Sequence, residues 1–281
     1  MPTRPPFQMR RARRARRALS VGLATLGVAS CGVSTQQEVQ LGNDYAAQIA
    51  TQLPMVKDPS LVSYISNLGN RIARVTDTRN LSWHFSIVDS KEVNAFAVPG
   101  GWIYVNRGLI ERAQNMSQVA GVLAHEIGHV TRRHSVQQMQ QAQGANVGLS
   151  LVCTLTKVCE SGVTQAAINV GGTALFAKFS RSDEAQADEE GVATTVKAGI
   201  DPNGIPEMFQ ILLSEQQRNP SAVDAFFATH PLEQDRIAAT RAQIARYQPA
   251  QLRGLTKDSP DFQAFRRRLM ALPPSPTVTS R

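Results

Sequence analysis

Apolar and polar positions recur at a helical period along much of the chain. Apolar side chains return every three or four positions between residues 44 and 76, with a break near the two prolines of that stretch. A second stripe follows Ser117, the predicted N-cap, and extends through Val130; the glutamine-rich residues 136–143 are expected to continue this helix. Three further helices are predicted, over residues 182–198, 206–217 and 231–247.

Three short stretches have the composition of strands. Residues 81–88 alternate, with aromatic and branched side chains on one face, and predict one strand. Residues 93–98 and 102–105 flank Pro99-Gly100-Gly101, which is a hairpin signal. The fold class is therefore α+β, mostly helical, with a small sheet.

The remaining segments divide the chain. We expect residues 31–45 to be a polar tether, residues 46–250 to be one domain, and residues 251–281 to be a partly disordered C-terminal tail. Residues 144–177 are small and apolar but are interrupted by charges. They predict helices around a loop, touching a membrane or covering a cleft, rather than a transmembrane hairpin.

The positive charge is confined to the beginning of the chain. The net charge is +8, but seven arginines lie among the first 17 residues, and no acidic residue precedes Glu38. From residue 31 onward the chain is nearly neutral, so we expect no nucleic-acid partner. A basic nucleic-acid binder stays possible only if the first arginines are retained in the mature protein.

Residues 1–30 have the layout of a secretory signal. An arginine-rich region precedes an apolar stretch from Ala18 to about Ala29, which is too short to span a bilayer. It ends in Val28-Ala29-Ser30-Cys31, which resembles a bacterial lipobox and makes Cys31 the expected lipidation site. The alternatives are an ordinary signal peptide and an uncleaved basic anchor. A membrane-anchored lipoprotein on the periplasmic side of the envelope follows; Gly32 favours the outer membrane over the inner one.

Two cysteines remain after lipidation. Cys153 and Cys159 are six positions apart and have no second ligand pair nearby, so their spacing does not indicate a zinc site. In an oxidising compartment they could form a small disulfide loop, and the alternative is two free buried thiols.

The strongest predicted helix carries the candidate chemistry. His125 and His129 are one turn apart, with about 5–6 Å between their Cβ atoms, so both imidazoles can reach one zinc ion. Glu126 lies beside that pair, where a general base for water belongs. The alternative is a solvated helix face that happens to carry histidines. His134 is out of register with the pair and is expected at the surface or in a groove.

A third ligand is available about 55 residues downstream. Glu184 and Asp188 share one face of a predicted helix. Glu184 could bind the zinc, and Asp188 could accept a hydrogen bond from a ligand histidine and fix its tautomer. Taken alone, acidic residues in a first turn only complement the helix dipole.

At this point the chain resembles the zinc metallopeptidase family of the HtpX-like, BepA-like, Oma-type and CaaX prenyl endopeptidases. The resemblance rests on four segments in consistent order, residues 94–101, 123–130, 179–188 and 230–236. It implies a zincin-like fold of the gluzincin type and one Zn²⁺ per chain.

The resemblance also implies a role for individual residues. The zinc ligands are His125, His129 and Glu184, and the catalytic base is Glu126. A regulatory or substrate-side histidine is implied at His230, and an active-site arginine at Arg236. The implied edge strand that pairs with a substrate backbone consists of Asn94, Ala95, Phe96, Ala97 and Val98.

Two departures narrow the resemblance. HtpX-like and prenyl-protease members are integral membrane proteins, whereas this sequence has no predicted span, so it is closer to the periplasmic lipoprotein members. BepA-like members carry a tetratricopeptide array, which we do not expect here because residues 251–281 are fewer than one repeat of about 34.

The function that these expectations imply is a zinc-dependent metalloendopeptidase of the envelope. Its partners would be unfolded or misfolded protein substrates and, through the lipid anchor, a membrane. The alternative is a chaperone-like assembly lipoprotein in which His230 closes the fourth zinc position. A serine or cysteine hydrolase is not supported, because the chain has no Gly-x-Ser-x-Gly motif and its cysteines lack a clear base.

Overall fold

A three-stranded sheet lies at the centre of the fold, in the order β1-β3-β2. The computed structural model describes Met1 and residues 33–142, 178–231 and 234–276. Strand β1 (His84–Val88) pairs in parallel with β3 (Trp102–Asn106), and β2 (Ala95–Val98) pairs antiparallel with β3. Gly100 and Gly101 turn the β2–β3 hairpin with φ of 81° and 105°, as its sequence predicts. The first strand begins at His84, later than expected.

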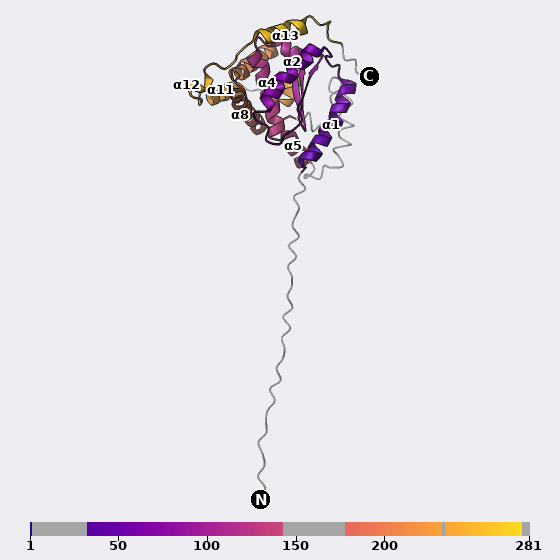
Figure 1. The fold of residues 1–281 in the computed structure, drawn as a ribbon, viewed down its shortest axis with the longest axis vertical. Helices are drawn as coiled ribbons and strands as arrows, with labels where there is room; N and C mark the ends of the chain where they lie inside the picture. Colours follow the sequence, from indigo (N-terminus) through magenta and orange to yellow (C-terminus); the bar gives the residue numbers. More distant parts are fainter. Residues whose placement is uncertain (2–32, 143–177, 232–233, 277–281) are drawn as a thin grey trace. The chain divides into compact units, whose positions relative to one another are not determined.

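Helices cover both faces of the sheet. In Figure 1 the strands lie between α1 (Thr35–Gln52) on one side and α2 (Pro59–Ala73) and α4 (Met116–Thr131) on the other. Phe96, Val98 and Tyr104 pack with Ile49 on the α1 side, while the opposite face joins the main core with α2 and α4. The sheet therefore has two buried faces, which explains why all four residues of β2 are buried.

The expectation of a tether over residues 31–45 is wrong from residue 35 onward. Ser34 caps α1 in a reciprocal pair with Gln37, and the helix packs on the sheet. One of the buried residues of this helix is charged, Glu38, with 1% of its surface exposed. Glu38 accepts hydrogen bonds from Arg79 and Arg133. The spacing of hydrophobic residues in the sequence cannot predict such hydrogen bonds.

The strongest predicted helix is present but ends earlier than expected. Its N-cap is Asn115, whose side chain accepts a hydrogen bond from the backbone N–H of Gln118, rather than Ser117. It does not continue through the glutamine-rich stretch, because Arg133 adopts φ of 61° and breaks the helix. The chain restarts as α5 (His134–Ala142).

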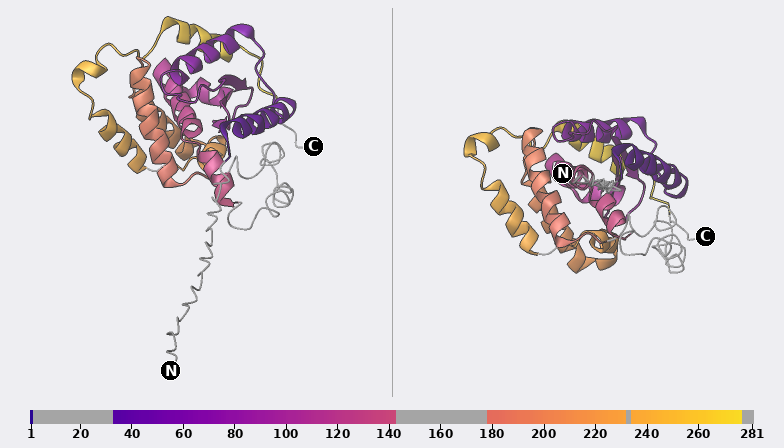
Figure 2. Two further views of the ribbon diagram at one scale, coloured as in Figure 1. Left: turned by 60° about the horizontal axis from the view of Figure 1, so that its bottom comes forward. Right: turned by 90° about the horizontal axis from the view of Figure 1, so that it is seen from below.

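Helix α8 (Arg181–Lys197) lies alongside α4, as both views of Figure 2 show. Its N-cap is Ser180, in a capping box with Asp183, so the helix begins one residue before the predicted range of 182–198. At Gly128 of α4 a Cβ would lie 3.2 Å from the Cα of Ala187, so the missing side chain permits the two helices to approach closely. Helix α9 (Gly204–Arg218) packs against α4 as well, close to the predicted range.

The C-terminal part of the domain contains more structure than the sequence predicted. A 3₁₀ turn (Pro220–Ala222) leads to α10 (Asp224–Thr229), then α11 (Gln234–Ile244), α12 (Pro249–Leu252) and α13 (Pro260–Met270). The short α3 (Arg107–Arg112) lies earlier in the chain, between β3 and α4. Helix α13 lies within the expected tail but buries Phe262, Phe265 and Leu269 against the core. Its apolar stripe is interrupted by arginines, which hides a helix that Ser259 caps.

Several predictions lie outside the described residues. They concern the leader over residues 1–30, lipidation at Cys31, the segment 144–177, and the pair Cys153 and Cys159. Among the residues that the structure describes, no helix is long and apolar enough to cross a membrane.

Candidate metal centre

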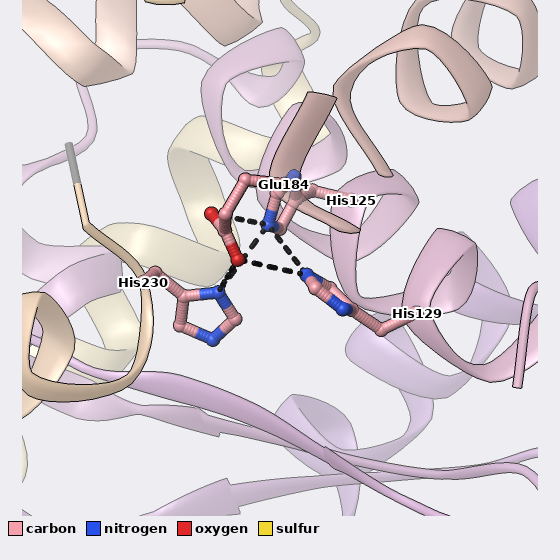
Figure 3. Close-up of side chains that lie close together, drawn as sticks. All are labelled: His125, His129, Glu184 and His230. Atoms are coloured by element: carbon pink, nitrogen blue, oxygen red, sulfur yellow. Dashed lines mark hydrogen bonds and ion pairs between the residues drawn. The ribbon is translucent and has the colours of Figure 1, made fainter. Parts of the chain in front are cut away.

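Four buried side chains from three parts of the chain converge on one point (Figure 3). His125 and His129 come from α4, Glu184 from α8, and His230 from the residue that ends α10. Each offers one nitrogen or oxygen atom, and these four atoms lie within 4.8 Å of one another. Residues more than 100 positions apart in the sequence thus share one potential ligand set.

The two histidines of α4 have the geometry of a shared cation site. Their Nε2 atoms lie 3.1 Å apart. Two nitrogens bound tetrahedrally to one zinc at 2.0–2.1 Å would lie about 3.3 Å apart. Burial holds the pKa of His129 well below its ordinary value, which leaves the neutral ring that a metal requires.

Glu184 brings an oxygen to the same point. Its Oε1 lies 3.3 Å from His129 Nε2, and its Oε2 lies 3.6 Å from His125 Nε2. Burial alone would raise the pKa of Glu184, but His230 and the hydrogen bonds from His129 and His230 hold it well below its ordinary value. A carboxylate oxygen and two imidazole nitrogens make a donor set that suits zinc.

Asp188 and Arg236 support this set from behind. Asp188 Oδ1 lies 2.9 Å from His125 Nδ1, on the far side of that ring from the cluster. The guanidinium of Arg236 donates two hydrogen bonds of 2.8 Å to Asp188, and its Nη1 lies 2.5 Å from Glu184 Oε2. Burial opposes the charge, but these carboxylates raise the pKa of Arg236 above its ordinary value. Arg236 therefore positions the two carboxylates in this structure.

Glu126 has no hydrogen-bond donor for either carboxylate oxygen among the described residues, although its side chain is 0% exposed. Burial raises its pKa above the ordinary value. The nearest ion-pair partner is His230 Nε2, at 3.5 Å from Glu126 Oε1. A buried carboxylate without donors is costly, and such a group is typical of a reactive site rather than of packing. The carboxylate of Glu126, which has no hydrogen-bond donor among the described residues, lies beside two imidazole nitrogens and a carboxylate oxygen that could bind a metal ion. This combination fits a catalytic metal.

His230 lies against the same group of atoms. Its Nδ1 is 3.0 Å from Glu184 Oε1 and 3.4 Å from His125 Nε2. Burial would lower the pKa of His230, but the carboxylates of Glu184 and Glu126 raise it above the ordinary value. The ring is therefore within reach both of a cation at this point and of the base, as Figure 3 shows for its approach to Glu184.

The expectation that His134 lies at the surface or in a groove is wrong. Its side chain is 1% exposed, and its Nδ1 lies 3.0 Å from His129 Nδ1. Burial lowers the pKa of His134. Helical spacing could not reveal this contact, because the break at Arg133 brings the ring into place. The only sequence signal was the concentration of three of the five histidines within ten residues.

Strand β2 is an outer strand of the sheet, preceded by Asn94. Within the described ranges it pairs with β3 on one side, and no strand is paired with its other edge. Ala95 and Ala97 face the main core, while Phe96 and Val98 face the α1 side. The side chains of β2 therefore serve packing, and recognition of an extended peptide at this strand would involve its main chain.

The sequence of this chain is similar to those of known proteins. Residues 59–244 match the model of peptidase family M48. The beta-barrel assembly-enhancing protease of Escherichia coli strain K12 is 30% identical over 247 residues, covering 85% of this chain and 50% of that protein. A relative in Vibrio cholerae serotype O1, which carries the same name in provisional form, is 34% identical over 234 residues, covering 80% and 48%.

A more distant relative is the mitochondrial metalloendopeptidase OMA1 of Schizosaccharomyces pombe. It is 28% identical over 174 residues, which cover 62% of this chain and 50% of that protein. The chain spans about half the length of these curated relatives. The family match over residues 59–244 contains all four residues of the candidate metal centre.

Proposed function

The chain belongs to peptidase family M48, and from this premise we propose that it is a zinc-dependent endopeptidase acting on extended or misfolded proteins of the bacterial envelope. The single observation that carries the proposal is the position of Glu126. Its buried carboxylate has no hydrogen-bond donor among the described residues and lies beside two imidazole nitrogens and a carboxylate oxygen. Neither a packing role nor an ion pair explains that combination.

His125, His129 and Glu184 would hold the zinc in this proposal. When bound, zinc supplies a Lewis acid that polarises the scissile carbonyl and lowers the pKa of water. Glu126 accepts the proton of the attacking water and donates it to the departing amine. Its raised pKa suits a group that must both accept and return a proton near neutral pH.

Asp188 and Arg236 organise the ligands rather than contact the reacting atoms in this assignment. Asp188 holds the ring of His125 by its Nδ1, and Arg236 holds Asp188 and Glu184 together. The family resemblance leaves either Arg236 or His230 as the residue that stabilises the developing oxyanion. The contacts of Arg236 favour the positioning role, which leaves His230 as the candidate for charge stabilisation.

The substrate class rests on the position of β2 as an outer strand of the described sheet and on the leader. An extended peptide can add its main chain to an exposed strand edge, which requires a locally unfolded substrate. The lipobox-like Cys31 would hold the mature chain at a membrane of the envelope, the outer membrane being favoured. The names of the relatives, which refer to beta-barrel assembly, support a role in protein quality control at that place.

A second candidate function is favoured by His230. Its Nδ1 lies 3.0 Å from Glu184, so it is near enough to be a fourth protein ligand. Zinc with four protein ligands is the structural arrangement, not the catalytic one. The chain would then be a zinc-bearing, chaperone-like assembly lipoprotein with a self-capped site.

The experiment compares hydrolysis of casein by the full chain and by Glu126→Gln, with the zinc content of both. We expect about one zinc in each and a loss of activity of about 10³-fold in the variant, because the general base is removed and the ligands remain. Glu189→Gln is the matched control, because Glu189 is exposed on α8 and its change should leave hydrolysis as in the parent.

The outcome separates the two functions. Zinc without hydrolysis in the parent would favour the self-capped lipoprotein, and His230→Ala should then release activity. Equal hydrolysis by the parent and Glu126→Gln would exclude Glu126 as the base.

A further inference from the structure

We propose that His134 is a positioning residue that fixes the tautomer and the ring orientation of His129 for metal binding. The inference rests on the proposed zinc site, and it adds a residue to which neither the sequence analysis nor the family resemblance gave a role. It concerns the ring nitrogen of His129 that faces away from the cluster.

The two nitrogens of His129 face different partners. Nε2 lies 3.1 Å from His125 Nε2 and 3.3 Å from Glu184 Oε1, so it points into the cluster. Nδ1 lies 3.0 Å from the Nδ1 of His134, which is a hydrogen-bonding distance. Because both rings are buried, water does not compete for this contact.

The proton count of the two rings determines the direction of the hydrogen bond. A neutral imidazole carries one proton, and a nitrogen that binds a cation must offer its lone pair. With Nε2 of His129 facing the metal, its proton is on Nδ1 and is donated to His134. His134 then accepts at Nδ1 and carries its own proton on Nε2, which lies 4.0 Å from Asp183 Oδ1. Asp183 is held near that place by the capping box of α8.

The backbone is shaped to bring His134 to this position. In a continuous helix, residue 134 would be five positions beyond His129 and would point about 140° away from it. Arg133 instead adopts the left-handed conformation, with φ of 61°, and restarts the chain at His134. Its side chain is fixed by Glu38, at 2.7 Å from Nε, and by the carbonyl of Val33. A strained residue that is held by two contacts is typical of a functional position.

The same arrangement occurs at the other ligand histidine. His125 also presents Nε2 to the cluster and Nδ1 to an outer partner, the carboxylate of Asp188. The two ligands thus differ only in the partner, which is a carboxylate for His125 and an imidazole for His129. Metal-ligating histidines are generally oriented in this way by a second hydrogen bond, and loss of such a partner weakens metal binding 10–100-fold.

Packing is the alternative explanation for a buried ring. Phe179 lies against His129 with ring centroids 3.9 Å apart and against His134 with 6.2 Å, so His134 could simply fill this aromatic group. Packing and acceptance of a hydrogen bond predict different results for substitutions of similar volume. An aromatic ring without an acceptor should serve packing but not positioning.

The test measures the affinity of the full chain for Zn²⁺ alone, by competition with a chromophoric chelator. We expect His134→Phe to weaken zinc binding 10–100-fold. We expect His134→Asn to remain within about threefold of the parent, because its Oδ1 is as many bonds from Cα as the lost Nδ1 and accepts the same hydrogen bond. His134→Gln, whose acceptor is one bond farther out, should behave like the Phe variant. The matched control is His84→Phe at the exposed start of β1, which should bind zinc as the parent does.

The Asn–Gln pair keeps the test decisive if His134→Phe does not fold. Equal zinc affinities of His134→Phe and the parent, or of the Asn and Gln variants, would overturn the proposal, and so would a loss of metal-free stability without a change in affinity. A parent chain that binds no zinc would overturn the proposed function together with this inference. Zinc bound by all variants alike would overturn only the role of His134.

Discussion

Glu38 and Glu126 are buried to nearly the same extent, with 1% and 0% of each residue exposed, but their surroundings are opposite. Glu38 accepts hydrogen bonds of 2.7 Å from both Arg79 and Arg133, and its second oxygen lies 3.4 Å from the backbone N–H of Gly100. Glu126 accepts none among the described residues. Both carboxylates are buried, but among the described residues only that of Glu38 has hydrogen-bond donors around it.

The difference separates a structural cluster from a reactive one. The carboxylate of Glu38 is neutralised inside the protein and joins α1, the β2–β3 hairpin and the turn after α4. Beside Glu126, which has no hydrogen-bond donor among the described residues, lie the nitrogen and oxygen atoms of a group that could hold a metal ion, an arrangement that suits an additional cation. We call the group around Glu38 the closed cluster, because its carboxylate is fully paired, and the group around Glu126 the open cluster, because that carboxylate has no hydrogen-bond donor among the described residues. The closed cluster stabilises the fold, whereas the open cluster keeps its capacity to bind and react.

The largest expected effect is that of zinc on the metal centre. Zinc at 1,000 times its Kd should stabilise the folded chain by about 4 kcal/mol, because it binds only the assembled donors. Thermal unfolding with and without a chelator measures this shift, and His129→Ala should abolish it. An unchanged Tm in the parent would contradict an open cluster, whereas His84→Ala, outside the cluster, should respond to zinc as the parent does.

Removal of the carboxylate from the closed cluster should have the next largest effect. Glu38→Ala leaves the guanidiniums of Arg79 and Arg133 without their counter-charge and should lower the free energy of unfolding by about 3 kcal/mol. This value is at the low end for a buried pair because the two arginine side chains are 18% and 31% exposed. Denaturant unfolding of the metal-free proteins measures the loss.

Asp44→Ala is the control for that change, because Asp44 is on the exposed side of the same helix. It should alter the free energy of unfolding by less than about 0.5 kcal/mol. A Glu38→Ala variant as stable as this control would mean that the buried ion pairs add nothing to the fold.

The smallest of these effects concerns the support of a metal ligand. Asp188→Asn keeps the shape of the side chain but removes the charge that faces His125 Nδ1 and Arg236. Zinc affinity should fall about tenfold, or about 1.4 kcal/mol, because the ligand ring is less well oriented and less basic. Zinc competition measures the change; an affinity equal to that of Glu189→Gln would show that Asp188 has no such role.

The local parts of the fold and the site could be predicted from the sequence. The hairpin at Pro99-Gly100-Gly101 follows from two glycines that tolerate positive φ, and the helix of His125 and His129 follows from a dense apolar stripe. Both histidines are one turn apart, so the helix alone brings their Nε2 atoms together. For these features the interacting residues are neighbours in sequence, and a periodic pattern is sufficient evidence.

Elements stabilised by distant partners could not be predicted in this way. The start of helix α1 looks like a tether because one of the helix's four buried residues is a glutamate, paired with arginines 41 and 95 positions away. Helix α13 looks like a tail because three consecutive arginines separate Phe265 from Leu269, and its apolar residues reach the core through contacts with α2 and α3. Hydrophobic period does not encode such pairings.

The sequence by itself determined the family, the helix that bears the two histidines and the base, and the residue types able to complete a metal site. Only the tertiary structure decided how Glu184 and His230 meet that helix, that Arg236 holds two carboxylates, and that His134 reaches the far nitrogen of His129. The physical reason is range: a helix fixes positions three or four residues apart, while the contacts of Glu184 and His230 span 46 to 105 residues and depend on packing and buried charge. The contact of His134 with His129 spans only five residues, but it depends on the helix break at Arg133, which Glu38 holds from 95 positions away.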